Sequence, residues 1–134
     1  TTLFWEIECE DNAFVTLKSS NNVVATLHSS ATQWRHKFLL EMEFENGYIN
    51  LDGILSSTRS YAPETMILGK REFEDITFAM GKPQESITYY EYDKSWSLEL
   101  EEFINAIHGF SILNNGTSND ALEIMKLIDS IYKQ

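Results

Sequence analysis

Apolar side chains alternate with polar ones through the first two thirds of the chain, and this period of two restricts the fold most. The clearest example runs from residue 36 to residue 45. One face carries His36, Phe38, Leu40, Met42 and Phe44, and the other carries Lys37, Glu41, Glu43 and Glu45. Successive side chains of a strand point to opposite faces, so this pattern predicts a half-buried strand. Asn46-Gly47 follows and predicts a type I′ hairpin turn, because both residues tolerate positive φ.

The same alternation predicts further strands on both sides of this hairpin. They are expected over residues 3–9, 13–17, 23–27, 48–52, 64–73 and 85–93. Turn-forming residues separate them at Asp11-Asn12, at 19–22 and at Gly81-Lys82-Pro83. The pattern is typical of antiparallel strands that follow one another along the chain.

Two helices are expected after residue 94, where the apolar period changes from two to that of a helix. The first extends from Ser95 to Gly109, and the second opens at Thr117 with the pattern of a capping box. Strands followed by helices indicate an α+β fold over a single domain, residues 1–134. We expect a mostly antiparallel sheet with the two C-terminal helices packed on one face and the other face open.

Four apolar residues fall out of phase with the core-facing set, on the face expected to be open. They are Phe4, Phe14, Val24 and Leu39. Single apolar residues scattered over a solvated face are ordinary. A contiguous patch would instead mark an interface. Both interpretations remain open on the sequence.

Charge and composition exclude several classes of partner. The 134 residues carry a formal net charge of −11, which repels nucleic acid and anionic membrane surfaces. No apolar stretch approaches the roughly 20 residues of a membrane span, and no signal peptide opens the chain. The lone cysteine, Cys9, lies in an alternating apolar run and is expected to be buried rather than nucleophilic. These features favour a cytoplasmic protein.

The residues offer few sites for chemistry. His28, His36 and His108 lack ligand spacing, so we expect no metal site. The many carboxylates follow strand and helix faces, where a solvated surface is the simpler interpretation than an acid–base pair. The six glycines are too scattered to form a phosphate-binding loop, so we expect no cofactor-binding residues in this chain.

The stretch Ser29 to His36 is the most unusual one. Gln33, Trp34 and Arg35 place an amide, an indole and a guanidinium together where a strand ends. An indole packs on the apolar face of a sugar ring, and the other two groups hydrogen-bond hydroxyls. These three residues are therefore candidates for substrate contact. The alternative is a plain strand connection in which Arg35 forms a salt bridge.

The order of motifs resembles the C-terminal domain of the Gfo/Idh/MocA oxidoreductases, a family named for glucose–fructose oxidoreductase and inositol dehydrogenase. The matching segments cover nearly the whole chain in the family's order. They are Glu10-Asp11-Asn12-Ala13, Leu27-His28-Ser29-Ser30, the run from Phe44 to Gly53, the helix with Glu99, Phe103 and Ile107, and Asn115-Gly116 with Asn119-Asp120-Ala121-Leu122.

The resemblance implies a substrate-binding and dimerisation domain. In the family such a domain follows a Rossmann domain that holds NAD or NADP, forms a homodimer through its open sheet face, and acts on sugars, inositols or nucleotide-linked sugars. The family's glycine fingerprint and Glu-Lys-Pro catalytic motif are absent here, so the resemblance assigns no catalytic residue. Because the chain begins within a strand-like pattern, we expect it to be a piece of a longer oxidoreductase that is inactive alone.

Two other functions fit the same sequence. One is a complete, non-enzymatic module that forms a homodimer through its sheet. The other is a small-molecule-binding cup with a central cavity lined by Phe38, Leu40 and Met42 and closed by the helices. Packing of those three residues directly on the helices would argue against the cup.

Overall fold

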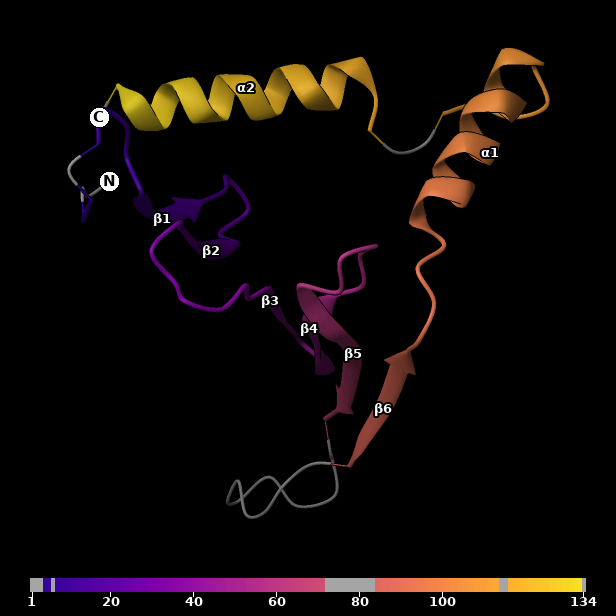
Figure 1. Ribbon diagram of the computed structural model, residues 1–134, viewed down its shortest axis with the longest axis horizontal. Helices are drawn as coiled ribbons and strands as arrows, with labels where there is room; N and C mark the ends of the chain where they lie inside the picture. Colours follow the sequence, from indigo (N-terminus) through magenta and orange to yellow (C-terminus); the bar gives the residue numbers. More distant parts are fainter. Residues whose placement is uncertain (1–3, 6, 72–83, 114–115, 134) are drawn as a thin grey trace. The chain divides into compact units, whose positions relative to one another are not determined.

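The computed structural model describes residues 4–5, 7–71, 84–113 and 116–133. Within these residues, six antiparallel strands form two sheets and are followed by two helices. Figure 1 shows these elements coloured along the sequence. The α+β class and the order of strands before helices are confirmed. The chain divides into two compact units, residues 34–94 and residues 1–33 with 95–134. The single domain and the packing of helices on a sheet face stay predictions.

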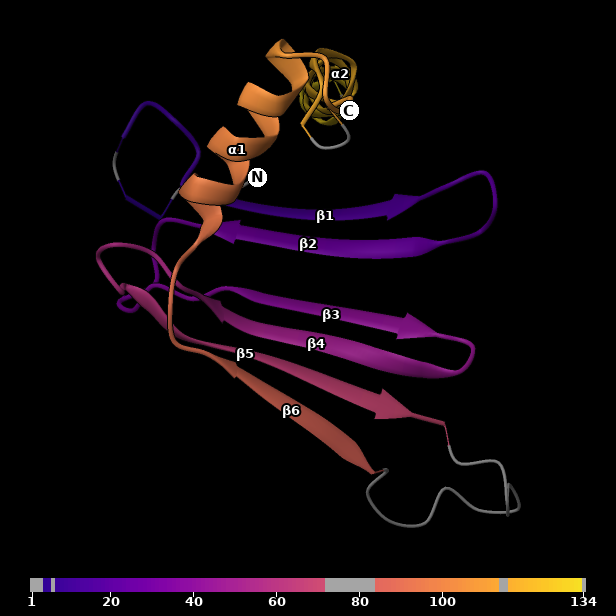
Figure 2. The same cartoon turned by 90° about the vertical axis from the view of Figure 1, so that its right-hand side faces the viewer.

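The unit of residues 34–94 is a four-stranded antiparallel sheet, called here the sheet unit. Its strands are β3 (Leu39–Phe44), β4 (Gly47–Ile54), β5 (Tyr61–Lys70) and β6 (Glu85–Tyr90), paired in chain order. Figure 2 shows the four strands side by side, each running opposite to the next. The turn predicted at 81–83 lies outside the described residues. The strand predicted from His36 begins instead at Leu39.

The register sorts the side chains of the sheet unit onto two faces. Cross-strand partners share a face, so the pairs Leu40–Leu51, Met42–Ile49 and Leu51–Met66 place the apolar set together. This apolar face carries Leu40, Met42, Phe44, Ile49, Leu51, Met66 and Leu68. Leu39, Glu41 and Glu43 lie on the opposite face, as predicted. Alternation along the chain therefore predicted the two faces correctly.

The turn of the β3–β4 hairpin differs from the predicted one. Phe44 pairs with Gly47, so the two loop residues are Glu45 and Asn46, and Gly47 is the first residue of β4. Gly47 has φ of 151°, and Asn46 is not among the residues with positive φ. A type I′ turn at Asn46-Gly47 is therefore wrong. Glycine is needed at 47 because a Cβ there would lie 2.2 Å from the carbonyl oxygen of Gly69.

Two other glycines shape the sheet unit. Gly53 lies at an irregularity in the β4–β5 register with φ of 80°, and a Cβ on it would lie 1.8 Å from the carbonyl oxygen of Pro63. A bulge that needs glycine in this conformation bends a strand and re-aims the residues near it. Gly69 gives room to the ring of Tyr48, which would come within 2.3 Å of an added Cβ.

The second unit contains the hairpin of β1 (Asn12–Lys18) and β2 (Val24–Ser30), which pair antiparallel over their full lengths. The predicted turn at 19–22 is confirmed, since Ser19 bonds to Val23 across it and Asn22 has φ of 66°. Phe14 and His28 face each other and their rings stack with centroids 4.3 Å apart. Phe14 is nevertheless 62% exposed.

The residues before β1 do not form the predicted strand. The described part of segment 3–9 contains bends, and Leu3 and Glu6 lie outside the described residues. Both amides of Phe4 and Trp5 donate to Oδ2 of Asp11 at 2.7 Å, which folds the chain back on itself and prevents an extended path. Cys9 is exposed, so the prediction that it is buried is wrong.

The helices are α1 (Ser95–Ile107) and α2 (Ser118–Tyr132). Gly109, with φ of 73°, ends α1, and the amide of Phe110 bonds to the carbonyl of Asn105 in a Schellman arrangement. Thr117 caps α2, and Asp120 completes the predicted capping box. No residue of either helix is buried. Among the described residues, neither helix combines the length and apolar character required to cross a bilayer.

Candidate functional site

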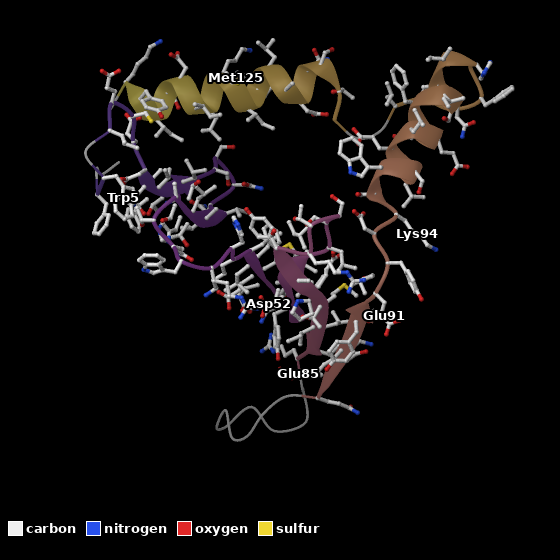
Figure 3. The ribbon with its side chains drawn as sticks, viewed as in Figure 1. Trp5, Asp52, Glu85, Glu91, Lys94 and Met125 are labelled. Carbon is white, nitrogen blue, oxygen red and sulfur yellow. The ribbon has the colours of Figure 1, made fainter. Side chains whose placement is uncertain are left out.

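One end of the sheet unit gathers aromatic and charged side chains. Antiparallel pairing brings the start of β3, the end of β4, the start of β5 and the end of β6 to the same edge, as the pairs Leu39–Asp52, Ile54–Tyr61 and Glu64–Tyr90 show. We call this edge the sheet end. Figure 3 labels Glu91 just past the finish of β6, and Glu85 at the other end of that strand.

Two of the predicted substrate-contacting residues precede β3 in the sheet unit. Trp34 is 100% exposed, and Arg35 is also exposed. Arg35 has no ion pair or hydrogen bond to any residue in the part of the chain that the structure describes, so the predicted alternative of a salt-bridged connection gains no support there. Gln33 is exposed and belongs to the other unit.

His36 connects this segment to the sheet end. Its ring lies 4.9 Å, centroid to centroid, from the ring of Tyr61, the first residue of β5. Two residues later, the carbonyl of Phe38 accepts a hydrogen bond of 3.0 Å from the amide of Gly53. These contacts hold the chain from residue 36 to residue 38 against the ends of β4 and β5.

A groove of 580 Å³ lies at the sheet end, next to the residue that His36 contacts. Its walls come from the loop after β4, the start of β5 and the end of β6. They are Leu55, Arg59, Ala62, Pro63, Glu64 and the run Tyr89, Tyr90, Glu91 and Tyr92. We call this feature the tyrosine groove. Its volume is in the range of pockets that bind small molecules.

Charged groups at the groove are held in different ways. The amide of Leu55 donates a hydrogen bond of 2.6 Å to Oε2 of Glu64, which fixes that carboxylate at the wall. Arg59 has a left-handed backbone with φ of 54°, and its side chain makes no ion pair or hydrogen bond to another described residue. Glu91 likewise has no such partner among the described residues. A ligand would meet donors and acceptors at the same place.

At the opposite end of the sheet unit, one side-chain hydrogen bond links β4 to β6. The hydroxyl of Tyr48 crosses Gly69 and donates to Oε1 of Glu85 at 2.6 Å. That bond, together with burial and the negative charges of Glu85 and Glu43, raises the pKa of the Tyr48 hydroxyl above its ordinary value. The Tyr48 hydroxyl and the Glu85 carboxylate are therefore engaged with each other, whereas Arg59 and Glu91 of the tyrosine groove have no side-chain partner among the described residues.

No group of three or more His, Cys, Asp or Glu residues that could hold a metal ion occurs within residues 4–5, 7–71, 84–113 and 116–133. The three histidines instead lie against aromatic rings, His28 with Phe14, His36 with Tyr61 and His108 with Phe110. Each of these contacts gives its histidine a packing role.

Sequence reasoning missed the tyrosine groove. The signal was present, because three of the four residues 89–92 are tyrosines. A strand rich in tyrosine is ordinary, however, and only the register shows that this run ends beside Glu64 and the loop that carries Arg59. The positive φ of Arg59 has no sequence signature.

Comparison with known proteins gives no neighbour for this chain. No family model, no curated protein and no solved structure matches the sequence or the fold.

Proposed function

We propose that this chain is the C-terminal substrate-binding and dimerisation domain of an NAD- or NADP-dependent sugar oxidoreductase of the Gfo/Idh/MocA type, located in the cytoplasm. The domain holds the sugar and contributes no catalytic or cofactor-binding residue. A Rossmann domain of the same polypeptide binds the dinucleotide and carries out hydride transfer with it.

The observation that carries this proposal is the exposure of Trp34. An indole that is 100% exposed leaves a large apolar surface in water, and covering that surface with a ligand is favourable. Trp34 stands beside Arg35 and two residues before His36, which contacts the sheet end. An apolar ring face next to a guanidinium matches the apolar face and hydroxyl edge of a sugar.

The fold supports the proposal in a second way. The resemblance implies a large, mostly antiparallel sheet with helices packed on one face. The strands are antiparallel and precede two helices, but they form a two-stranded and a four-stranded sheet. The last helix opens at the capping box of Thr117 and Asp120, directly before Ala121-Leu122 of the family-like motif. The antiparallel pairing, the order of the elements and the capped last helix agree with the proposed domain.

Dimerisation is proposed through the sheet face that carries Leu39. Leu39 and Ile87 lie on that face and are 45% and 46% exposed. We expect light scattering after size-exclusion chromatography to give twice the mass of the chain, and Leu39→Lys to shift it to a monomer. A wild-type chain that elutes as a monomer at all concentrations would contradict this part of the proposal.

The enzymatic part is tested on the complete reading frame that contains this sequence. The expressed protein should reduce NAD or NADP with a sugar or inositol as hydride donor. Trp34→Ala should raise KM by about tenfold or more, because removing an aromatic ring that packs on a ligand costs about 1.4 kcal/mol or more. Trp96→Ala, which removes a 78% exposed indole of α1, is the control and should leave KM unchanged.

Two results would contradict the proposal. One is a reading frame without any nucleotide-binding segment and without nicotinamide-dependent turnover. The other is a turnover that responds equally to Trp34→Ala and Trp96→Ala, since the two indoles would then be equivalent.

A further inference from the structure

The tyrosine groove has a chemistry that the proposed function does not specify. We infer that it is a specificity element that receives one uncharged sugar or polyol ring and rejects phosphorylated or nucleotide-linked sugars. The inference rests on the proposed function for the kind of ligand, and it adds the residues and the charge that select among such ligands.

The tyrosines supply surfaces for a ring. Tyr89 and Tyr92 are 69% and 78% exposed, and Tyr90 is 40% exposed, although all three line the groove. Each has an apolar ring face, and Tyr89 and Tyr92 also offer a hydroxyl group, whereas the Tyr90 hydroxyl donates to Sδ of Met66 at 3.9 Å. A sugar ring has an apolar face formed by its C–H groups, so burial against these rings would stabilise the complex.

The charged residues supply an acceptor and a donor for the hydrogen bonds of a sugar hydroxyl. Glu64 is held by the Leu55 amide through Oε2, and its Oε1 forms no hydrogen bond to another described residue. Arg59 contributes donors from a loop fixed by the backbone hydrogen bonds Arg59 to Ser56 and Ala62 to Arg59. A sugar hydroxyl donates to a carboxylate and accepts from a guanidinium at the same time.

The charge of the groove sets its selectivity. Glu64 and Glu91 line it together with a single cation, Arg59, so its formal charge is negative. The whole chain, which includes these three residues, carries a formal net charge of −11. A phosphoryl group carries about −1.5 to −2 charges at neutral pH, and it would be repelled by both carboxylates and by the wider field. An uncharged ring meets no such repulsion.

Calorimetric titration of the 134-residue chain tests this inference. We expect glucose and myo-inositol to bind at least about tenfold more tightly than glucose 6-phosphate. Tyr92→Ala should weaken glucose binding by about tenfold, and Tyr92→Phe, which keeps the ring, should weaken it less. Tyr132→Ala removes a 62% exposed tyrosine from α2 and should have no effect. The double substitution Glu64→Gln and Glu91→Gln should reduce the ratio of the affinity for glucose to the affinity for glucose 6-phosphate.

Several results would overturn the inference. They are no binding of either uncharged ligand, binding that Tyr92→Ala leaves unchanged, or equal affinity for glucose and its 6-phosphate. A proline-rich peptide also fits aromatic grooves, and a peptide that binds while sugars do not would assign the groove to a protein partner instead.

Failure of the inference and failure of the proposed function are distinguishable. If the complete protein oxidises sugars and Tyr92→Ala leaves KM unchanged, the tyrosine groove does not bind the sugar and the proposed function is retained. If glucose binds the tyrosine groove but the complete protein shows no nicotinamide-dependent turnover, the proposed function is wrong and the sugar-binding role of the groove is retained.

Discussion

The sheet unit and the unit of hairpin and helices bury their residues to different degrees. Leu55, Gly53 and Gly69 of the sheet unit are buried, and most residues of β5 are at least half covered. In the other unit only Asp11 is buried among the described residues, and neither helix buries any residue. A four-stranded sheet with central strands paired on both sides can be stable alone, whereas a two-stranded hairpin is marginal. The candidate site therefore lies on the unit whose residues are better covered.

The largest expected effect comes from filling the bulge of the sheet unit. Gly53→Ala should destabilise it by about 3 kcal/mol or more, because the new Cβ meets the Pro63 carbonyl at 1.8 Å and φ of 80° is unfavourable for alanine. Gly109→Ala is the matched control, since Gly109 has φ of 73° but nothing within 4 Å of an added Cβ. It should cost about 1–2 kcal/mol. Equal losses in the free energy of unfolding, measured by urea denaturation, would contradict the difference expected between the two sites.

A smaller effect is expected at the capping box of α2. The amide of Asp120 donates to Oγ1 of Thr117 at 3.2 Å, and the amide of Thr117 donates to Oδ2 of Asp120 at 2.9 Å. Thr117→Ala should cost the helix about 1 kcal/mol. Hydrogen exchange should accelerate in α2 while the strands of the sheet unit keep their protection. Ser118→Ala, one residue further on, is the control and should leave exchange unchanged.

A pH-dependent effect on stability is expected at Tyr48. Its pKa is raised in the folded protein by the bond to Glu85, so the stabilisation is complete below the ordinary tyrosine pKa of about 10. It is lost as pH rises through the folded value. Tyr48→Phe should therefore be less stable than wild type at pH 8, and the gap should close above pH 10. Thermal melts of wild type and Tyr48→Phe at pH 8 and above pH 10 measure this gap.

The smallest effect on stability is expected at Asp11 when the pH is lowered. Burial raises the pKa of Asp11, but hydrogen bonds from the amides of Trp5 and Phe4 and from the side chain of Asn12 outweigh it, and the pKa is lowered. The stabilisation is thus present above the ordinary aspartate pKa of about 3.9 and is lost as pH falls through the folded value. Trp5 fluorescence should report this loss in wild type and not in Asp11→Asn. If the same fluorescence change at acidic pH occurs in Asp11→Asn, the assignment of this change to Asp11 is contradicted.

The sequence predicted what local patterns determine. Alternation placed Leu40 and Met42 on one face, and turn and cap residues located the Ser19–Asn22 turn, the end of α1 at Gly109 and the start of α2 at Thr117. It failed where a distant group decides. Asp11 accepts hydrogen bonds from the amides of Phe4 and Trp5, and the strand that the alternating pattern predicts there does not form. The tyrosine groove escaped prediction because it depends on the pairing of Glu64 with Tyr90 across two strands.

The most direct test is a nuclear magnetic resonance titration of the ¹⁵N-labelled chain with glucose. The three indole signals come from Trp5, Trp34 and Trp96, and each reports on a different part of the sequence. We predict that glucose shifts the Trp34 indole and the amides of Arg59 and of residues 89–92, and that the Trp5 and Trp96 indoles stay in place. Shifts confined to Trp96 and the helices, or no shifts at all, would contradict a sugar site at the sheet end.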